Sequence, residues 1–145
     1  MTALFGTLAV PIIQGILTSK REARVRVEER RHAAYLDAMT FAQIVEETVD
    51  DLVEDPVYRS NRKLPEAPDR LLVRARLELV APVGVTRAFD ALTRAWDAFR
   101  FNLNEAGPIE VIGDEPTWQV SDDAEDVKRL RQALTTLKLE LKTAR

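Results

Sequence analysis

The stretch Val85–Leu103, VTRAFDALTRAWDAFRFNL, carries the most regular apolar pattern in the chain. Its large apolar side chains recur at alternating steps of four and three residues, which places them on one face of an α-helix. Such a face has to be covered by another surface. We therefore predict either a core seam or a groove that binds a partner protein, and the candidate residues are Phe89, Leu92, Trp96 and Phe99.

A short helix is predicted immediately before this stretch. It runs from about Asp69 to Ala81, and Pro68 suits a position close to its first turn. The sequence APVGV at residues 81–85 combines a proline with a glycine, which predicts a tight corner between the two helices.

A leucine-rich helix is predicted near the end of the chain. Ser121 or Asp122 can cap it, Glu125 stands three residues after Asp122, and basic residues gather towards Arg145. Its apolar side chains again step by three and four residues, so they complete a bundle within the chain or form a coiled coil with a second copy. These side chains are Val127, Leu130, Leu134, Leu137 and Leu141.

The first third of the chain predicts one long helical path from Leu4 to about Val53, which Pro56 ends. Pro11 predicts a kink or a break near its start. Beyond residue 26 this path also has an apolar stripe, formed by Val27, Ala34, Ala38, Phe41, Val45, Thr48 and Leu52.

Two loops separate the predicted helices, near residues 55–68 and 104–121. The second loop admits a short strand, and we expect it to fold over an edge of the bundle through Ile109, Val111, Ile112 and Trp118. The predicted fold class is all-α. An N-terminal hydrophobic helix, residues 1–19, runs into a bundle of about four helices within residues 20–145.

Composition narrows the function. The chain has 145 residues, which suits one domain, and no cysteine, which excludes disulfides and thiolate metal sites. The net charge of -3 and the isoelectric point near 5.3 argue against a general nucleic-acid binder. We therefore expect no nucleic-acid partner.

The segment Met1–Ser19 contains no charged side chain. As a helix, residues 2–19 cover about 27 Å, slightly less than the ~30 Å hydrocarbon core of a bilayer. Basic residues follow at once, and the candidate membrane-flanking set is Lys20, Arg21, Arg24 and Arg26. Since basic flanks stay on the cytoplasmic side, we predict a single-pass protein of the cell membrane with a cytoplasmic C-terminal body.

A different interpretation of the same run remains open. A segment interrupted by Pro11, Gln14 and two glycines also suits a buried helix of a soluble protein. In that case residues 3–18 pack in the core or in the interface of a homodimer, and the protein is cytoplasmic. A secretory signal peptide fits poorly, because its basic residues would precede the apolar run.

The first forty residues, MTALFGTLAVPIIQGILTSKREARVRVEERRHAAYLDAM, resemble the front of small uncharacterised membrane-anchored helical proteins of high-GC bacteria. In that group a short anchor runs into a cytosolic helix rich in arginine and glutamate. The resemblance implies an anchor and a helical body. It implies no activity and no site residue.

Two sequence patterns resemble metal-binding motifs. An acidic cluster at residues 46–55 places carboxylates one turn apart, as in a Mg²⁺ site, and EETVDD resembles the paired acidic motif of the all-α nucleotide pyrophosphatases. The predicted third helix lacks the second Glu-x-x-Asp motif of that family, so a solvated face or ion pairing with arginines of the second helix is the simpler interpretation. His32 follows Glu29 as in di-iron bundles, but these need a second histidine.

From the sequence we therefore predict no catalytic, cofactor-binding or metal-binding residue. The expected function is that of a membrane-anchored subunit, adaptor or scaffold, which contacts lipid through residues 3–18 and the basic flank. Its body would bind a protein partner or a second copy. The alternatives are a soluble helical bundle and, more remotely, a Mg²⁺-dependent nucleotide hydrolase.

Overall fold

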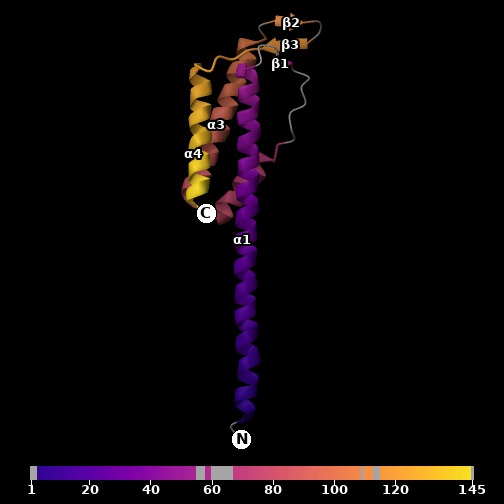
Figure 1. The fold of residues 1–145 in the computed structure, drawn as a ribbon, viewed down its shortest axis with the longest axis vertical. Coiled ribbons are helices and arrows are strands. Elements are labelled where there is room, and N and C mark those ends of the chain that lie inside the picture. The colour runs from indigo at the N-terminus through magenta and orange to yellow at the C-terminus, as the bar shows by residue number, and fades with distance from the viewer. Residues whose placement is uncertain (1–2, 55–57, 60–66, 109, 113–114, 145) are drawn as a thin grey trace.

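The computed structural model describes residues 3–54, 58–59, 67–108, 110–112 and 115–144, and the surroundings of side chains in 11–54, 67–108 and 118–144. These residues form four α-helices and three very short strands (Figure 1). The helices are α1 (Ala3–Glu54), α2 (Arg70–Val80), α3 (Val83–Ala106) and α4 (Glu125–Thr143). The predicted small helical bundle is confirmed.

Helix α1 has 52 residues and passes through Pro11 without interruption. Of the predicted kink or break at this proline, the break is therefore wrong. Proline removes one backbone hydrogen bond and crowds the preceding turn, but the helical residues on both sides of Pro11 keep the path continuous. The helix ends at Glu54, two residues before Pro56.

Local sequence explains both ends of α2. The Asp69 side chain accepts hydrogen bonds from the backbone N–H groups of Leu71 and Leu72, at 2.9 and 3.4 Å, and so caps the first turn. At the other end Ala81 adopts an extended backbone, as expected for a residue before proline. The predicted corner is present, and α3 starts directly after Pro82.

Helix α3 extends to Ala106, beyond the predicted loop boundary at residue 104. Gly107 then takes a positive φ of 69°, and its N–H donates to the carbonyl groups of Leu103 and Asn104. Only glycine adopts this backbone conformation without steric cost.

The predicted cap of α4 is wrong by about one turn. Ala124, not Ser121 or Asp122, is the N-cap residue, and it makes no side-chain capping bond. The Ser121 hydroxyl instead accepts from the N–H of Asp123, while Asp122 pairs with Arg131. The helix still begins with acidic residues, Glu125 and Asp126, which suit its partially positive N-terminus.

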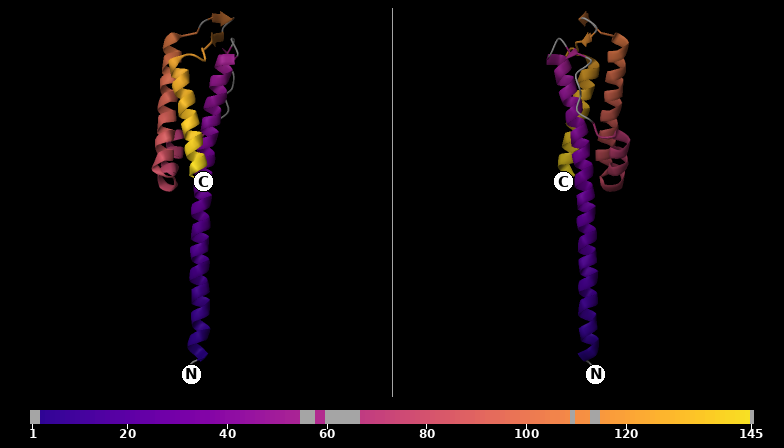
Figure 2. Two further views of the ribbon diagram at one scale, coloured as in Figure 1. Left: turned by 60° about the vertical axis from the view of Figure 1, so that its left-hand side comes forward. Right: turned by 90° about the vertical axis from the view of Figure 1, so that its right-hand side faces the viewer.

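The core lies between the C-terminal half of α1 and the other three helices, with α3 and α4 packed most extensively (Figure 2). The α4 seam is confirmed as an intramolecular contact, because all five of its predicted residues are buried. The α1 stripe is buried from Ala34 to Leu52, whereas Val27 is exposed. The largest fully buried side chains are Phe89, Phe99, Leu52, Leu77, Leu92, Leu130, Leu137 and Leu141.

A small antiparallel sheet lies at the end of the bundle opposite the N-terminus (Figure 1). Its strands are β1 (Tyr58–Arg59), β2 (Glu110–Ile112) and β3 (Glu115–Trp118), in the order β1-β3-β2. Trp118 and Val120 pack partly against the core, as expected for a segment that folds over its edge. The predicted contacts of Ile109, Val111 and Ile112 lie outside the described side chains.

Candidate functional site: the projecting segment and the foot of the bundle

About half of α1 lies outside the bundle. Its N-terminal residues 3–33, here called the projecting segment, continue alone from the end of the bundle that also holds the α2–α3 corner and the C-terminus (Figures 1 and 2). Every residue from 11 to 33 is exposed. At 1.5 Å per residue these 23 residues extend for about 34 Å.

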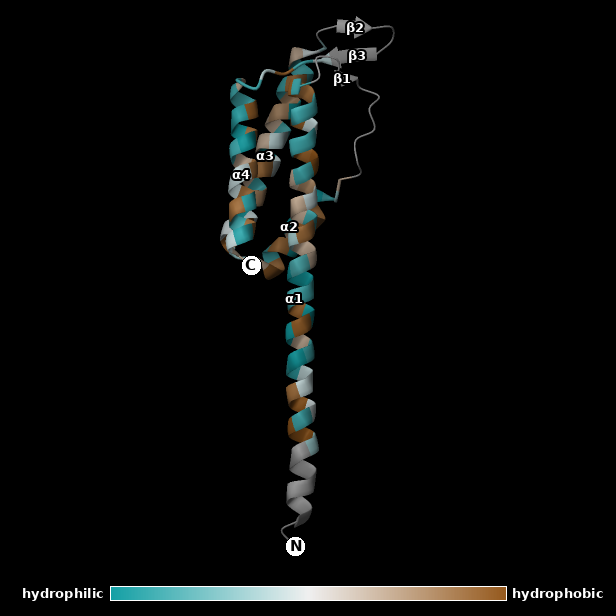
Figure 3. Cartoon of the chain, viewed as in Figure 1, coloured by the Kyte–Doolittle hydropathy of each residue, from teal (hydrophilic) through white to brown (hydrophobic). Residues whose placement is uncertain are grey.

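The apolar residues of the projecting segment have no cover within the chain. Ile12 is 61% exposed and Leu17 is 60% exposed, and Ile13 and Ile16 are similarly open. Ile12, Ile16, Ala23 and Val27 also fall in line with the buried stripe that begins at Ala34, because the spacing between them is four or seven residues. The core face of α1 thus continues beyond the core, and hydrophobic residues alternate with hydrophilic ones along the projecting segment (Figure 3).

The predicted basic flank lies on the projecting segment, and all four of its residues, Lys20, Arg21, Arg24 and Arg26, are exposed. Among the residues whose side chains the structure describes, which begin at Pro11 in this helix, no helical stretch is long and apolar enough to cross a membrane.

An exposed surface at the end of the bundle adjoins the projecting segment. We define this foot surface by Val27 and Arg30 of α1, Arg76 and Leu79 of α2, and Val83 of α3. Leu79 is 84% exposed and Val83 is 66% exposed, so two large aliphatic side chains face solvent at this corner. A hollow of about 620 Å³ opens here between α1 and α2, lined by Val27, Arg30, Ala33, Arg76, Leu79 and Val80.

The two arginines of the foot surface differ in their surroundings. Arg76 Nη1 donates to Asp37 Oδ2 at 2.7 Å, which fixes α2 against α1 just above the hollow. Arg30 is exposed, one turn nearer the N-terminus than Ala34, where the covered stripe begins. The hollow therefore combines an apolar lining with two guanidinium groups.

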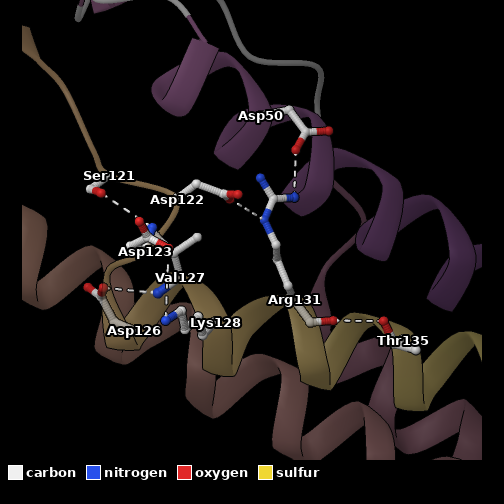
Figure 4. A network of polar contacts seen from close by, with 9 residues as sticks. All are labelled: Asp50, Ser121, Asp122, Asp123, Asp126, Val127, Lys128, Arg131 and Thr135. Atoms are coloured by element: carbon white, nitrogen blue, oxygen red, sulfur yellow. Dashed lines mark hydrogen bonds and ion pairs between the residues drawn. The ribbon is translucent and has the colours of Figure 1, made fainter.

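Two carboxylates of the acidic cluster, Glu46 and Asp50, pair with α4 and not with the predicted arginines of α2, so for these two the prediction is wrong. Lys138 Nζ contacts Glu46 Oε2 at 2.5 Å, and Arg131 Nη1 donates to Asp50 Oδ1 at 2.7 Å. The Nε of Arg131 also donates to Asp122 at 2.9 Å, so one guanidinium joins α1 to the segment before α4 (Figure 4). These hydrogen bonds, chiefly that to Asp50, raise the pKa of Arg131 above its ordinary value.

No metal site appears among the residues that the structure describes: they contain no group of three His, Asp or Glu side chains able to hold an ion. His32 is exposed beside Tyr35, Leu36 and Met39. Asp55, the last residue of the predicted acidic cluster, lies outside the described residues. This geometry gives no support to the nucleotide hydrolase alternative.

The α3 seam is mostly buried, but Trp96 is not a full member of the core. Phe89, Leu92 and Phe99 are at most 1% exposed, whereas Trp96 is only partly buried. Its ring stacks on Phe99 with centroids 5.7 Å apart, and the guanidinium of Arg100 lies 6.0 Å from the Trp96 ring centroid. Trp96 therefore covers the edge of the core, where an indole remains partly hydrated.

Comparisons with family models, with curated proteins and with solved structures found no match to this chain. The candidate site therefore has to be interpreted from its own geometry.

The basic flank is predictable from the sequence, whereas the foot surface was not predicted. A signal for it was present, since α2 carries apolar residues on more than one face: Leu71, Leu72, Val73, Leu77, Leu79 and Val80. Only Val73 and Leu77 of α2 are buried. A short helix with more apolar residues than one core face can cover indicates a second apolar surface.

Proposed function

We propose that the protein is a single-span membrane protein, held by residues 3–18 of α1, whose helical body acts as a subunit, adaptor or scaffold on the cytoplasmic side. The observation that carries this proposal is the exposure of the apolar residues 12–17 on a helix that projects from the bundle. Exposed isoleucine and leucine need an apolar environment, and a bilayer supplies one.

The basic flank supports the same proposal. It lies between the apolar residues and the bundle, where cationic side chains reach lipid headgroups. Under the positive-inside rule this arrangement places the bundle in the cytoplasm. A reporter that is active only in the cytoplasm should therefore be active when fused after Arg145, and a periplasmic reporter should be inactive there.

The alternative is a soluble homodimer. Because residues 11–18 make no contact with this chain's own core, the alternative now requires that they pack in an interface between two copies. The same exposed side chains favour it, but a dimer interface gives no reason for a dense basic flank beside the apolar run.

Fractionation of the untagged protein, followed by alkaline carbonate extraction, tests the proposal. The chain should stay in the membrane pellet after carbonate treatment. Ile13→Arg should move protein into the soluble fraction, because an arginine within a span costs about 2.5–3.5 kcal/mol. Val25→Arg, an equally drastic change at an exposed residue beyond the first flank arginines, is the matched control and should stay in the pellet. A wild-type chain that is soluble and dimeric refutes the anchor.

A further inference from the structure

A membrane anchor in α1 does not by itself account for the exposed apolar and basic side chains of the foot surface. We propose that it is a second membrane contact, which binds the headgroups of anionic phospholipids and seats the bundle on the bilayer beside its own anchor. This inference rests on the proposed anchor. The ligand chemistry is a phosphate-bearing, negatively charged lipid surface.

The projecting segment carries an excess of positive charge beside the foot surface. Residues 20–31 contain six Lys or Arg and three Glu, which gives a net charge of +3. Arg26 and Arg30 stand four residues apart, so they share one side of the helix, and Arg30 lines the hollow. This part of α1 therefore presents a net positive charge to an anionic surface.

The foot surface adds apolar groups to that charge. Leu79 and Val83 flank the α2–α3 corner in the sequence and are the most exposed aliphatic residues at this end of the bundle. Aliphatic side chains beside arginines are typical of surfaces that bind at the boundary of headgroups and acyl chains. Two carboxylates nearby are paired within the bundle, Glu78 with Arg74 at 2.9 Å and Asp37 with Arg76, and the second pair takes up the charge of Arg76.

Helix geometry places the foot surface within reach of the headgroups. From Ser19 to the level between Val27 and Arg30, α1 rises by about 14 Å. The headgroup layer is about 5–8 Å thick on each side of the hydrocarbon core. An upright helix therefore leaves the foot surface about 6–9 Å above this layer.

A modest tilt of α1 brings the foot surface down to the headgroup layer. Neighbouring helices pack about 8–10 Å apart, so α2 lies to one side of the α1 axis by about that distance. A tilt of α1 by about 30° towards α2 is within the range of membrane helices and lowers the foot surface to about 7 Å above the hydrocarbon boundary. Leu79 and the guanidinium group of Arg30 then meet the headgroups.

The absence of cysteine from the sequence makes a direct test simple. The full chain carrying Leu79→Cys is labelled with an environment-sensitive fluorophore and reconstituted into phosphatidylcholine vesicles with or without phosphatidylserine. We expect a blue shift and quenching by lipid-borne spin labels when phosphatidylserine is present. Phe101→Cys, which is 65% exposed at the other end of α3, is the matched control and should respond to neither.

A charge variant tests the electrostatic part. Arg30→Gln should lower the ratio of docked to undocked bundle about fivefold, which corresponds to about 1 kcal/mol for one basic residue near an anionic surface. Arg129→Gln removes another exposed arginine, from the half of α4 far from the foot surface, and should leave the ratio unchanged.

The outcomes separate this inference from the anchor. If the chain resists carbonate extraction but the Leu79 label ignores phosphatidylserine, the foot surface does not bind lipid and the anchor stands. If the chain does not stay with the vesicles, both proposals fail. A Leu79 response that rises with protein density in neutral vesicles means that a second copy covers the surface, which also overturns the lipid contact.

Discussion

Replacement of Phe89 by alanine is the sharpest test of the packing described above. Phe89 is fully buried on α3, and its ring meets Phe41 of α1 edge to face, with centroids 5.5 Å apart and planes at 61°. Phe89→Ala removes this aromatic contact and leaves a cavity between the two helices. Buried Phe→Ala changes cost about 3–5 kcal/mol, a large part of the 5–15 kcal/mol that stabilises a typical domain.

Urea unfolding of the full chain in mild detergent, followed by tryptophan fluorescence, measures this loss. Both tryptophans of the sequence, Trp96 and Trp118, lie in the body of the protein, so the signal reports the bundle and not the projecting segment. Phe101→Ala deletes an equally large ring that is 65% exposed, and it should cost less than about 1 kcal/mol. Equal losses for the two variants would refute the assigned orientation of α3.

Three further outcomes are expected. Trp96→Ala should cost about 2 kcal/mol in thermal or urea unfolding followed by circular dichroism, less than Phe89→Ala, because the indole is only partly buried; an equal loss would place Trp96 inside the core. Gly107→Ala should cost about 1–2 kcal/mol in the same assay, because its φ of 69° strains any residue with a side chain; a neutral result would mean that α3 ends differently. Addition of Mg²⁺ should leave the melting temperature unchanged, because Glu46 and Asp50 are held by α4, whereas saturation of a tight site at a hundredfold excess would add about 2.7 kcal/mol.

Periodicity predicted the parts of the fold that depend on one buried face. In α3 and α4, large apolar residues recur at the spacing that places them on one face of a helix. The structure buries nearly all of those side chains. Pro82 likewise indicated the corner between α2 and α3, because proline acts on the backbone locally, although α3 begins at Val83 and so includes Gly84.

The parts that sequence did not predict depend on competition between partners distant in the chain. Asp122 looks like a helix cap when only its neighbours are considered, but Arg131 engages it together with Asp50 from α1. The exposure of Trp96 and Leu79 is set in the same way, by where the other helices end. Of the candidate site, the basic flank was predicted because it is contiguous, whereas the foot surface was missed because three helices contribute to it.

The continuity of α1 makes the protein a rigid shaft with a bundle fixed at one end. Because no break separates residues 3–33 from the core, the direction in which the bundle faces is locked to the direction of the apolar residues near the N-terminus. One residue inserted between Ser19 and Arg30 would turn the bundle about the shaft by about 100°, whereas seven residues would raise it by about 10 Å with almost the same facing. A rotation or tilt of the N-terminal residues is therefore transmitted to the bundle. The length of the connecting helix fixes both the distance between these residues and the bundle and their relative orientation about the helix axis.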